Sequence, residues 1–195
     1  MNRSTDESAI VRSVRANLGR VEKNSGVNSR PAITLAFAQS LDGCITASQG
    51  SSTAISSDQS MLMTHQLRAM HNAILVGINT VLVDDPRLTV RHANGESPIP
   101  VVLDSRLRTP PTARLLHQDR PQAIIATLPD ASKERELKLV KAGARVIRIP
   151  EAPDGGIQLS KLFLWLRKQH VNSLMIEGGA KVISSVLADC LVDQL

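Results

Sequence analysis

Residues 72–91, NAILVGINTVLVDDPRLTVR, decide the fold that we expect of this chain. The apolar run at 72–76 predicts a buried strand that ends at Gly77, where a backbone without Cβ lets a ligand come close. The segment after it carries side chains that can bind a ligand through hydrogen bonds: Thr80, Asp84, Asp85 and Arg91. Pro86 fixes a turn, because its ring sets φ and disfavours helix in the preceding residue. Polar side chains after a strand are typical of the ligand-binding edge of an α/β sheet, although a purely structural loop is the alternative.

Strand-like and helix-like segments alternate on both sides of this stretch. We expect strands at residues 32–38, 72–76, 99–104, 122–127, 144–149 and 172–177, and helices at 57–71, 132–142, 159–169 and 180–190. This alternation predicts an α/β fold with a mostly parallel central sheet and helices on both faces. The final residues, 191–195, lead toward a further strand that the sequence does not contain, so we expect the C-terminal strands to be missing.

The composition limits the kinds of partner. The chain has 195 residues, of which 42% are hydrophobic and only 2% aromatic, so one core must be built mainly from aliphatic side chains. The net charge is +5, but residues 1–30 hold six basic and three acidic side chains and supply +3 of it. A nearly neutral body with few aromatic residues argues against a nucleic-acid partner.

Residues 1–30 form a polar, basic N-terminal extension before a body at 31–195. Five apolar residues of this extension share one helical stripe, which predicts a short amphipathic helix that caps the body or a partner: Ile10, Val11, Val14, Leu18 and Val21. No apolar run is long enough for a signal peptide or a membrane span, so we expect a cytoplasmic protein with no membrane contact.

Cysteines and histidines give no metal motif. Cys44 and Cys190 lie far apart, and no histidine belongs to an HExxH or similar cluster, so we expect free thiols and no metal site. His65 and His71 flank Arg68 on the predicted helix, where all three are expected at the surface.

The turn after the last predicted strand is the second candidate binding element. Gly178 and Gly179 precede a helix, whose free N–H groups favour phosphate and whose glycines allow a close approach; a simple tight turn is the alternative. Glu177 beside them would repel phosphate but can accept hydrogen bonds from sugar or base groups. A ligand with phosphate at one end and a polar heterocycle at the other suits both.

Three smaller features complete the set. Residues 40–43, SLDG, follow the first strand, although an ordinary β-turn explains them equally well. Arg68 and Arg91 could clamp a phosphate. Ser105 and Arg106 stand at a strand end where they could hold an adenosine 2′-phosphate and so select NADPH over NADH. No motif for acyl or nucleotide hydrolysis is present.

Four motifs in one order, SLDG, VGINTVLVDDPRLTVR, PIPVVLDSRLRTP and MIEGGAKV, carry a resemblance to a known family. The chain from residue 31 to residue 195 resembles the pyrimidine reductase of riboflavin biosynthesis, which is often the C-terminal half of a bifunctional deaminase–reductase. The resemblance implies a dihydrofolate-reductase-like fold, NADPH as cofactor and a homodimer. The zinc motif of the deaminase half is absent.

The resemblance also assigns residues. NADPH-contacting positions correspond to Ala38, Ala54, Thr80, Asp84, Ser105, Gly179, Ala180, Lys181, Val182, Ile183, Ser184 and Ser185. Substrate-contacting positions correspond to Ser52, Arg68, Leu88, Arg91 and Glu177, with the arginines on the ribose 5-phosphate. Cys44 replaces a frequent lysine and Ala54 a frequent tryptophan, which removes a flat surface that could pack on the cofactor.

The reaction implied is NADPH-dependent reduction of the ribosyl group of 5-amino-6-(5-phosphoribosylamino)uracil to the ribitylamino product, by hydride transfer to C1′. Asp84 is the candidate catalytic residue, although an ionised carboxylate has no proton to donate. Three alternatives stay open: the 2,5-diamino pyrimidinone form as substrate, another substrate such as dihydrofolate, and a truncated, inactive nucleotide-binding domain.

Overall fold

Six short, mostly apolar segments form one sheet in the computed structural model, which describes residues 8–24, 29–39, 57–117 and 121–195. The strands are β1 (Ala32–Leu35), β2 (Ala73–Gly77), β3 (Ile99–Leu103), β4 (Ile124–Thr127), β5 (Arg145–Arg148) and β6 (Ser173–Gly178). They lie in the order β1-β6-β2-β3-β4-β5, and every neighbouring pair is parallel. The predicted parallel sheet is therefore confirmed.

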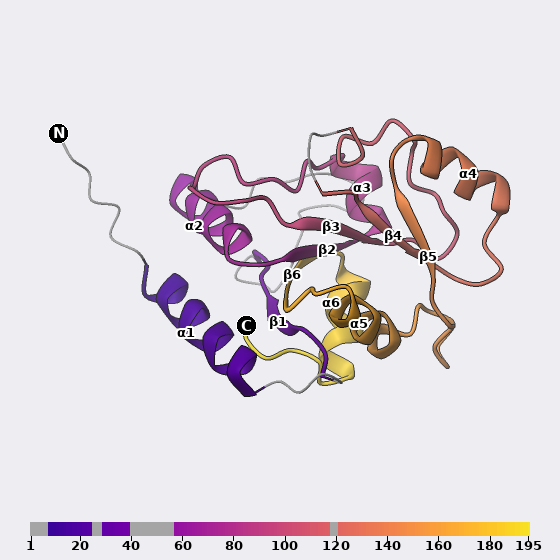
Figure 1. Ribbon diagram of the computed structural model, residues 1–195. Coiled ribbons are helices and arrows are strands. Elements are labelled where there is room, and N and C mark those ends of the chain that lie inside the picture. The colour runs from indigo at the N-terminus through magenta and orange to yellow at the C-terminus, as the bar shows by residue number, and fades with distance from the viewer. Residues whose placement is uncertain (1–7, 25–28, 40–56, 118–120) are drawn as a thin grey trace.

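Helices cover both faces of this sheet (Figure 1). They are α1 (Ala9–Asn24), α2 (Asp58–Ala69), α3 (Ile78–Asp84), α4 (Lys133–Lys141), α5 (Leu159–Lys168) and α6 (Ala180–Ala188). One face packs against α5 and α6, where Leu75 and Leu174 of the sheet share a buried cluster with Phe163 of α5. The opposite face packs against α3 and α4, where Ile74 and Val102 belong to a second cluster. Alternate residues of each strand point to opposite faces, so both faces are apolar.

The first helix and the last residues meet at the β1 edge of the sheet. Val11 and Val14 of α1 are buried against Leu67 of α2 and Met175 of β6. Ile10, also on the predicted stripe, is 54% exposed and lies outside this contact. The helix thus covers part of the body, and the amphipathic helix expected within residues 1–30 is present.

The C-terminal residues also reach this edge. The backbone N–H of Leu35 donates to the carbonyl oxygen of Gln194 at 2.8 Å, and Thr34 and Gln194 form a parallel bridge. Arg30 donates to both carboxylate oxygens of Asp193, at 2.5 and 3.0 Å. The last residues, which the sequence predicts to lead toward a further strand, therefore lie beside β1.

Helix α3 was not predicted, because residues 78–84 were expected to be a loop. It has seven residues, which is about two turns, and only Val81 is buried. The helical spacing of apolar residues is therefore too weak to predict a helix here. The helix ends at Asp85, whose φ of 39° is left-handed. The predicted first strand is also too long, since it ends at Leu35 rather than residue 38.

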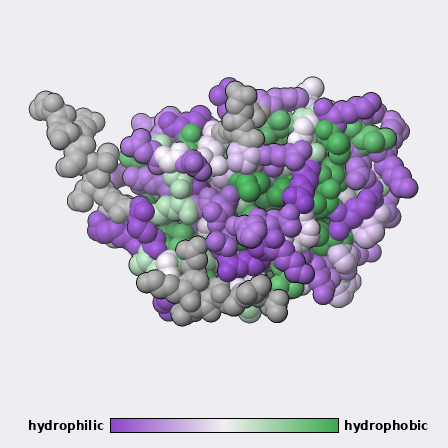
Figure 2. Space-filling model, in the orientation of Figure 1, coloured by the Kyte–Doolittle hydropathy of each residue, from purple (hydrophilic) through white to green (hydrophobic). Residues whose placement is uncertain are grey.

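The face of the molecule seen in Figure 2 is largely hydrophilic, with hydrophobic side chains showing between polar ones near its middle and right-hand side. Among the described residues, no helix combines the length and the hydropathy that crossing a membrane requires.

Candidate active site

The carboxyl ends of β2 and β6 lie side by side and bring two glycines together. A β-bulge shifts the register, so that Leu75 lies opposite Ile176 but Val76 lies opposite Gly178. Glu177 is thus the extra residue of the bulge, a feature common next to active sites. Gly179 has φ of 91°, and a Cβ there would lie 3.6 Å from the backbone of Gly77. The positive φ favours glycine at this turn, whereas the 3.6 Å distance is an ordinary van der Waals contact.

Arg68 and Glu177 bind each other at this end of the sheet. Arg68, near the end of α2, donates through Nε to Oε1 of Glu177 at 2.6 Å and through Nη2 to Oε2 at 2.5 Å. Its Nη1 donates to the carbonyl oxygen of Thr89 at 3.0 Å. The side chains of Arg68 and Glu177 are only 12% and 13% exposed. The expectation of a solvated Arg68 was therefore wrong, because the helix turns this side chain toward β6.

Arg91 lies beside this pair and shares Thr89 with it. The Nη1 of Arg91 donates to the Thr89 hydroxyl at 2.5 Å, while Arg68 uses the Thr89 carbonyl. Burial, followed by the charges of Arg68, Arg87 and Arg114, lowers the pKa of Arg91 from its ordinary value, and the charge of Glu177 opposes this. The cations therefore repel one another, and an anion placed among them would be stabilised.

His65 and His71 are not surface residues, contrary to the sequence-based expectation. His65 is 2% exposed, and its Nδ1 accepts the backbone N–H of Arg91 at 3.1 Å. His71 is 5% exposed; its Nδ1 donates to the carbonyl oxygen of Leu67 at 2.7 Å, which leaves Nε2 to accept the hydroxyl of Thr34 at 2.9 Å. Burial lowers the pKa of both histidines, that of His65 to about 4. Both imidazoles point inward, that of His71 toward Thr34 of β1 and that of His65 toward the backbone of Arg91.

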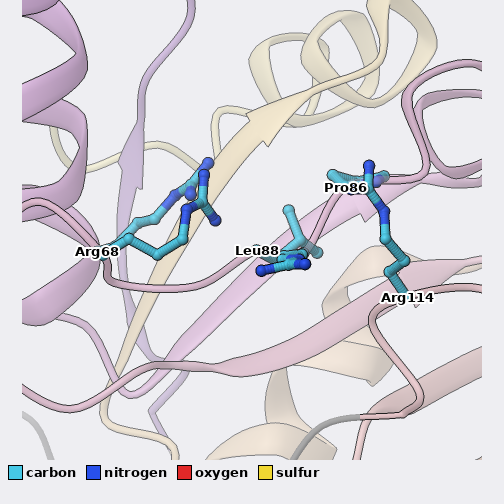
Figure 3. A pocket seen from close by; sticks show the side chains of 6 residues that line it. Arg68, Pro86, Leu88 and Arg114 are labelled. Carbon is cyan, nitrogen blue, oxygen red and sulfur yellow. The ribbon is translucent and has the colours of Figure 1, made fainter.

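A pocket of about 290 Å³ opens between α2 and the segment that follows α3. Four of its six lining residues are arginines, and the full set is Arg68, Pro86, Arg87, Leu88, Arg91 and Arg114. Figure 3 shows Arg68 at one end of the pocket and Arg114 at the other, with Leu88 between them. The pocket is wide enough for a small phosphorylated molecule.

Strained backbone shapes one wall of this pocket. Asp85 and Leu88, on either side of Pro86 and Arg87, have φ of 39° and 54°. Arg114 holds this segment: its backbone N–H donates to Oδ1 of Asp85 at 2.8 Å and its Nε to the carbonyl oxygen of Asp85 at 2.8 Å. Strained residues of this kind persist where surrounding contacts fix them, and they cluster at binding sites.

The structure brings together most of the substrate-binding residues assigned by resemblance. Arg68, Leu88 and Arg91 line the pocket, and Glu177 is bound to Arg68. Ser52 lies outside the described residues, as do residues 40–43 and Cys44. The role of each residue stays a prediction.

Only part of the predicted cofactor set lies at or next to the glycine turn. Thr80 lies in α3 with its Oγ1 3.8 Å from where a Cβ of Gly178 would be, and Asp84 is exposed at the end of that helix. Residues 180–185 form the first part of α6. Ser105 and Arg106 follow β3, whereas Ala38 is exposed beyond the end of β1 and Ala54 lies outside the described residues.

Sequence reasoning missed three residues of the site. Arg87 and Arg114 line the pocket, and His65 holds the backbone of Arg91. Arg87 is next to the singled-out Asp-Pro pair and could have been included. Arg114 is separated from Asp85 by 29 positions, and no local pattern links them.

Comparisons with known proteins show the family to which the chain belongs. The family model described as "RibD C-terminal domain" matches residues 31–195. The chain belongs to the RibD C-terminal domain family. A relative from Methanothermobacter thermautotrophicus, named 2,5-diamino-6-ribosylamino-4(3H)-pyrimidinone 5′-phosphate reductase, is 40% identical over 172 residues, which covers 85% of this chain and 76% of the relative. The riboflavin biosynthesis protein RibD of Aquifex aeolicus is 35% identical over 167 residues, 85% of this chain and 45% of that protein. The expected resemblance to the pyrimidine reductases of riboflavin biosynthesis is confirmed.

Solved structures show the same fold. Acinetobacter baumannii RibD superposes with a TM-score of 0.75 at 29% identity, covering 93% of this chain. This RibD C-terminal domain chain spans 48% of that bacterial protein. The Saccharomyces cerevisiae riboflavin biosynthesis reductase Rib7 gives a TM-score of 0.68 at 26% identity, over 90% of this chain and 76% of the yeast chain. The predicted fold class is thus confirmed by its neighbours as well as by its sheet.

Proposed function

We propose that this RibD C-terminal domain is an NADPH-dependent reductase of a phosphoribosylamino-pyrimidine. The observation that carries the proposal is the four-arginine pocket beside Glu177 and the glycine turn, at the carboxyl edge of a parallel sheet. Ligands of open α/β sheets bind at this edge. Arginines suit a sugar phosphate because each guanidinium can donate two parallel hydrogen bonds to phosphate oxygens.

The glycine turn fits a dinucleotide. A Cβ on Gly179 would lie 3.6 Å from the Gly77 backbone and 3.4 Å from Val182 Cγ2, so a side chain there would fill the space at the start of α6 that glycine leaves open to a phosphate. Thr80 and Ser105 would add hydroxyl donors, and Arg106 a charge for a 2′-phosphate. The bound cofactor would supply the hydride for C1′ of the substrate's opened ribosyl group.

The protein's own residues would bind and orient the substrate. Arg91 and Arg68 would hold its phosphate, and Leu88 would contact its body. Glu177 would accept hydrogen bonds from the heterocycle once Arg68 turns toward the phosphate. Asp84 is exposed and would position groups near the cofactor, while a bound water or a group of the substrate itself would supply the proton.

The deaminated uracil is the substrate form that we expect, and the motifs of bacterial type favour it. A specific observation favours a second candidate, the 2,5-diamino pyrimidinone, because relatives at 40% and 37% identity carry that name. A homodimer, which the resemblance implies, and the cytoplasmic location expected from the sequence belong to the same proposal.

The test follows NADPH absorbance with each pyrimidine in turn, and with dihydrofolate as a control. Substrate-dependent oxidation with either pyrimidine, and none with dihydrofolate, supports the proposal. In Arg91→Ala we expect KM for the pyrimidine to rise about a hundredfold, as two charge-assisted hydrogen bonds are lost, with unchanged NADPH affinity. A folded chain that binds NADPH without turnover would instead indicate an inactive nucleotide-binding domain.

A further inference from the structure

His65 touches the backbone of the pocket without lining the pocket itself. It lies on α2 one turn before Arg68, and its side chain is buried. Its Nδ1 accepts the backbone N–H of Arg91 at 3.1 Å, across 26 positions of sequence. The His92 ring meets it edge to face, with ring centroids 4.7 Å apart. A buried histidine is thus attached at the point where Arg91 leaves the backbone.

The two pocket arginines converge on one small residue and need an external restraint. Arg68 donates to the Thr89 carbonyl at 3.0 Å, and Arg91 donates to the Thr89 hydroxyl at 2.5 Å. Their like charges repel, so the side-chain contacts alone would let Arg91 swing toward solvent. Holding the Arg91 backbone keeps its guanidinium over Thr89.

Only an unprotonated Nδ1 can accept this hydrogen bond. Burial lowers the pKa of His65 to about 4, and the charges of Arg68 on its own helix and of Arg91 and His92 on the facing segment act in the same direction. A hydrogen bond with the Thr89 backbone opposes these effects and raises the pKa of His65. At neutral pH the ring is therefore uncharged, with its proton on Nε2.

We propose that His65 is a positioning residue for substrate binding: its neutral ring accepts the Arg91 N–H and fixes the Arg91 guanidinium beside Arg68. This rests on the proposed function in so far as Arg91 binds the substrate phosphate. Under this proposal His65, which lies outside the pocket, contributes to the selectivity for phosphorylated substrates.

The decisive comparison uses two variants at the same position. Asparagine places its Oδ1 close to where Nδ1 stood, whereas leucine fills the space without an acceptor. We expect His65→Leu to raise KM for the phosphorylated pyrimidine about tenfold, with kcat and NADPH affinity within about twofold, and His65→Asn to restore KM to within about threefold. His92→Ala keeps the Arg91 hydrogen bond and serves as the matched control, with KM unchanged. Equal KM values in the leucine and asparagine variants would overturn the proposal.

A second measurement needs no variant and no turnover. Nitrogen-15 NMR of the unmodified protein at pH 7 should show the His65 ring neutral, with the proton on Nε2 and a coupling from Nδ1 to the Arg91 amide. A charged ring, or a proton on Nδ1, contradicts the proposal outright. If the NMR signature is present but neither pyrimidine is reduced, the proposed function fails while the positioning of Arg91 stands. Binding of inorganic phosphate by the same variants then shows whether the positioning of Arg91 serves an anion site.

Discussion

Arg68 and Glu177, 109 positions apart, form a two-pronged ion pair in which Nε and Nη2 of the arginine donate to the two carboxylate oxygens. The pair joins the end of α2 to the bulge of β6, and both side chains are nearly buried. Sequence reasoning assigned both residues to the substrate, and the structure binds them to each other. A substrate that used these two residues, as we propose, would compete with this pair, so the strength of the pair would bear on both stability and affinity.

Glu177→Gln should destabilise the fold by about 2 kcal/mol, because a nearly buried guanidinium loses its counter-charge. Arg68→Leu should show a loss of similar size. The double variant should lose clearly less than the sum, since neither charge is then left unpaired. Urea unfolding of the four proteins gives the coupling energy.

The exposed pair Glu134–Lys138 is the matched control. Its atoms lie 2.8 Å apart, but its side chains are 77% and 61% exposed, so solvent screens the pair and Glu134→Gln should leave the unfolding free energy almost unchanged. Equal effects at Glu177 and Glu134 would mean that the Arg68 pair does not contribute through burial.

The sheet and five of its helices could be predicted because each carries a clear period or apolar run. Helix α3 could not, because its seven residues offer one buried side chain, Val81. Arg91 and Glu177 were found through the chemistry of strand ends. The Arg68–Glu177 pair and the hydrogen bond from Arg91 to His65 could not be found, since they join α2 to segments 109 and 26 positions away and no local spacing links them.

Gly77→Ala tests how closely the two glycine backbones and α6 pack. A Cβ at Gly77 would lie 3.0 Å from Cγ2 of Val182, although its φ of −80° suits alanine. We expect a loss of about 1–2 kcal/mol from overpacking. Adding Val182→Ala removes the colliding methyl group, so the double variant should be more stable than the sum of the single variants predicts. Additive losses in urea unfolding would show that the collision is not the cause.

Stability should fall as the pH falls from about 6.5 to about 4. The folded protein disfavours a charged His65, whose pKa is lowered to about 4, while the unfolded chain takes up the proton near 6.5. The stability is thus fully present above about 6.5 and is lost progressively below it, by up to about 3 kcal/mol. The lowered pKa of His71 acts in the same direction.

His65→Asn isolates this contribution, because asparagine keeps an acceptor for Arg91 but does not titrate. Urea midpoints of the unmodified protein and the variant, measured between pH 4 and pH 7, should converge toward the acidic end. A difference between the two urea midpoints that stays constant across this pH range would show that His65 takes up its proton equally in the folded and the unfolded protein.

Arg114 should matter more for substrate affinity than for stability. It holds the strained segment through Asp85, and its Nη2 also lies 3.4 Å from the carbonyl oxygen of Asp84. Its side chain is 52% exposed, so Arg114→Ala should change the unfolding free energy by no more than about 1 kcal/mol. The same change frees the backbone that carries Leu88 and removes one charge from the pocket, so KM for the phosphorylated pyrimidine should rise about tenfold. Arg145→Ala, which removes an arginine stacked on Trp165 at the far edge of the sheet, should leave KM unchanged. A drop in stability without a change in KM would assign Arg114 to folding alone.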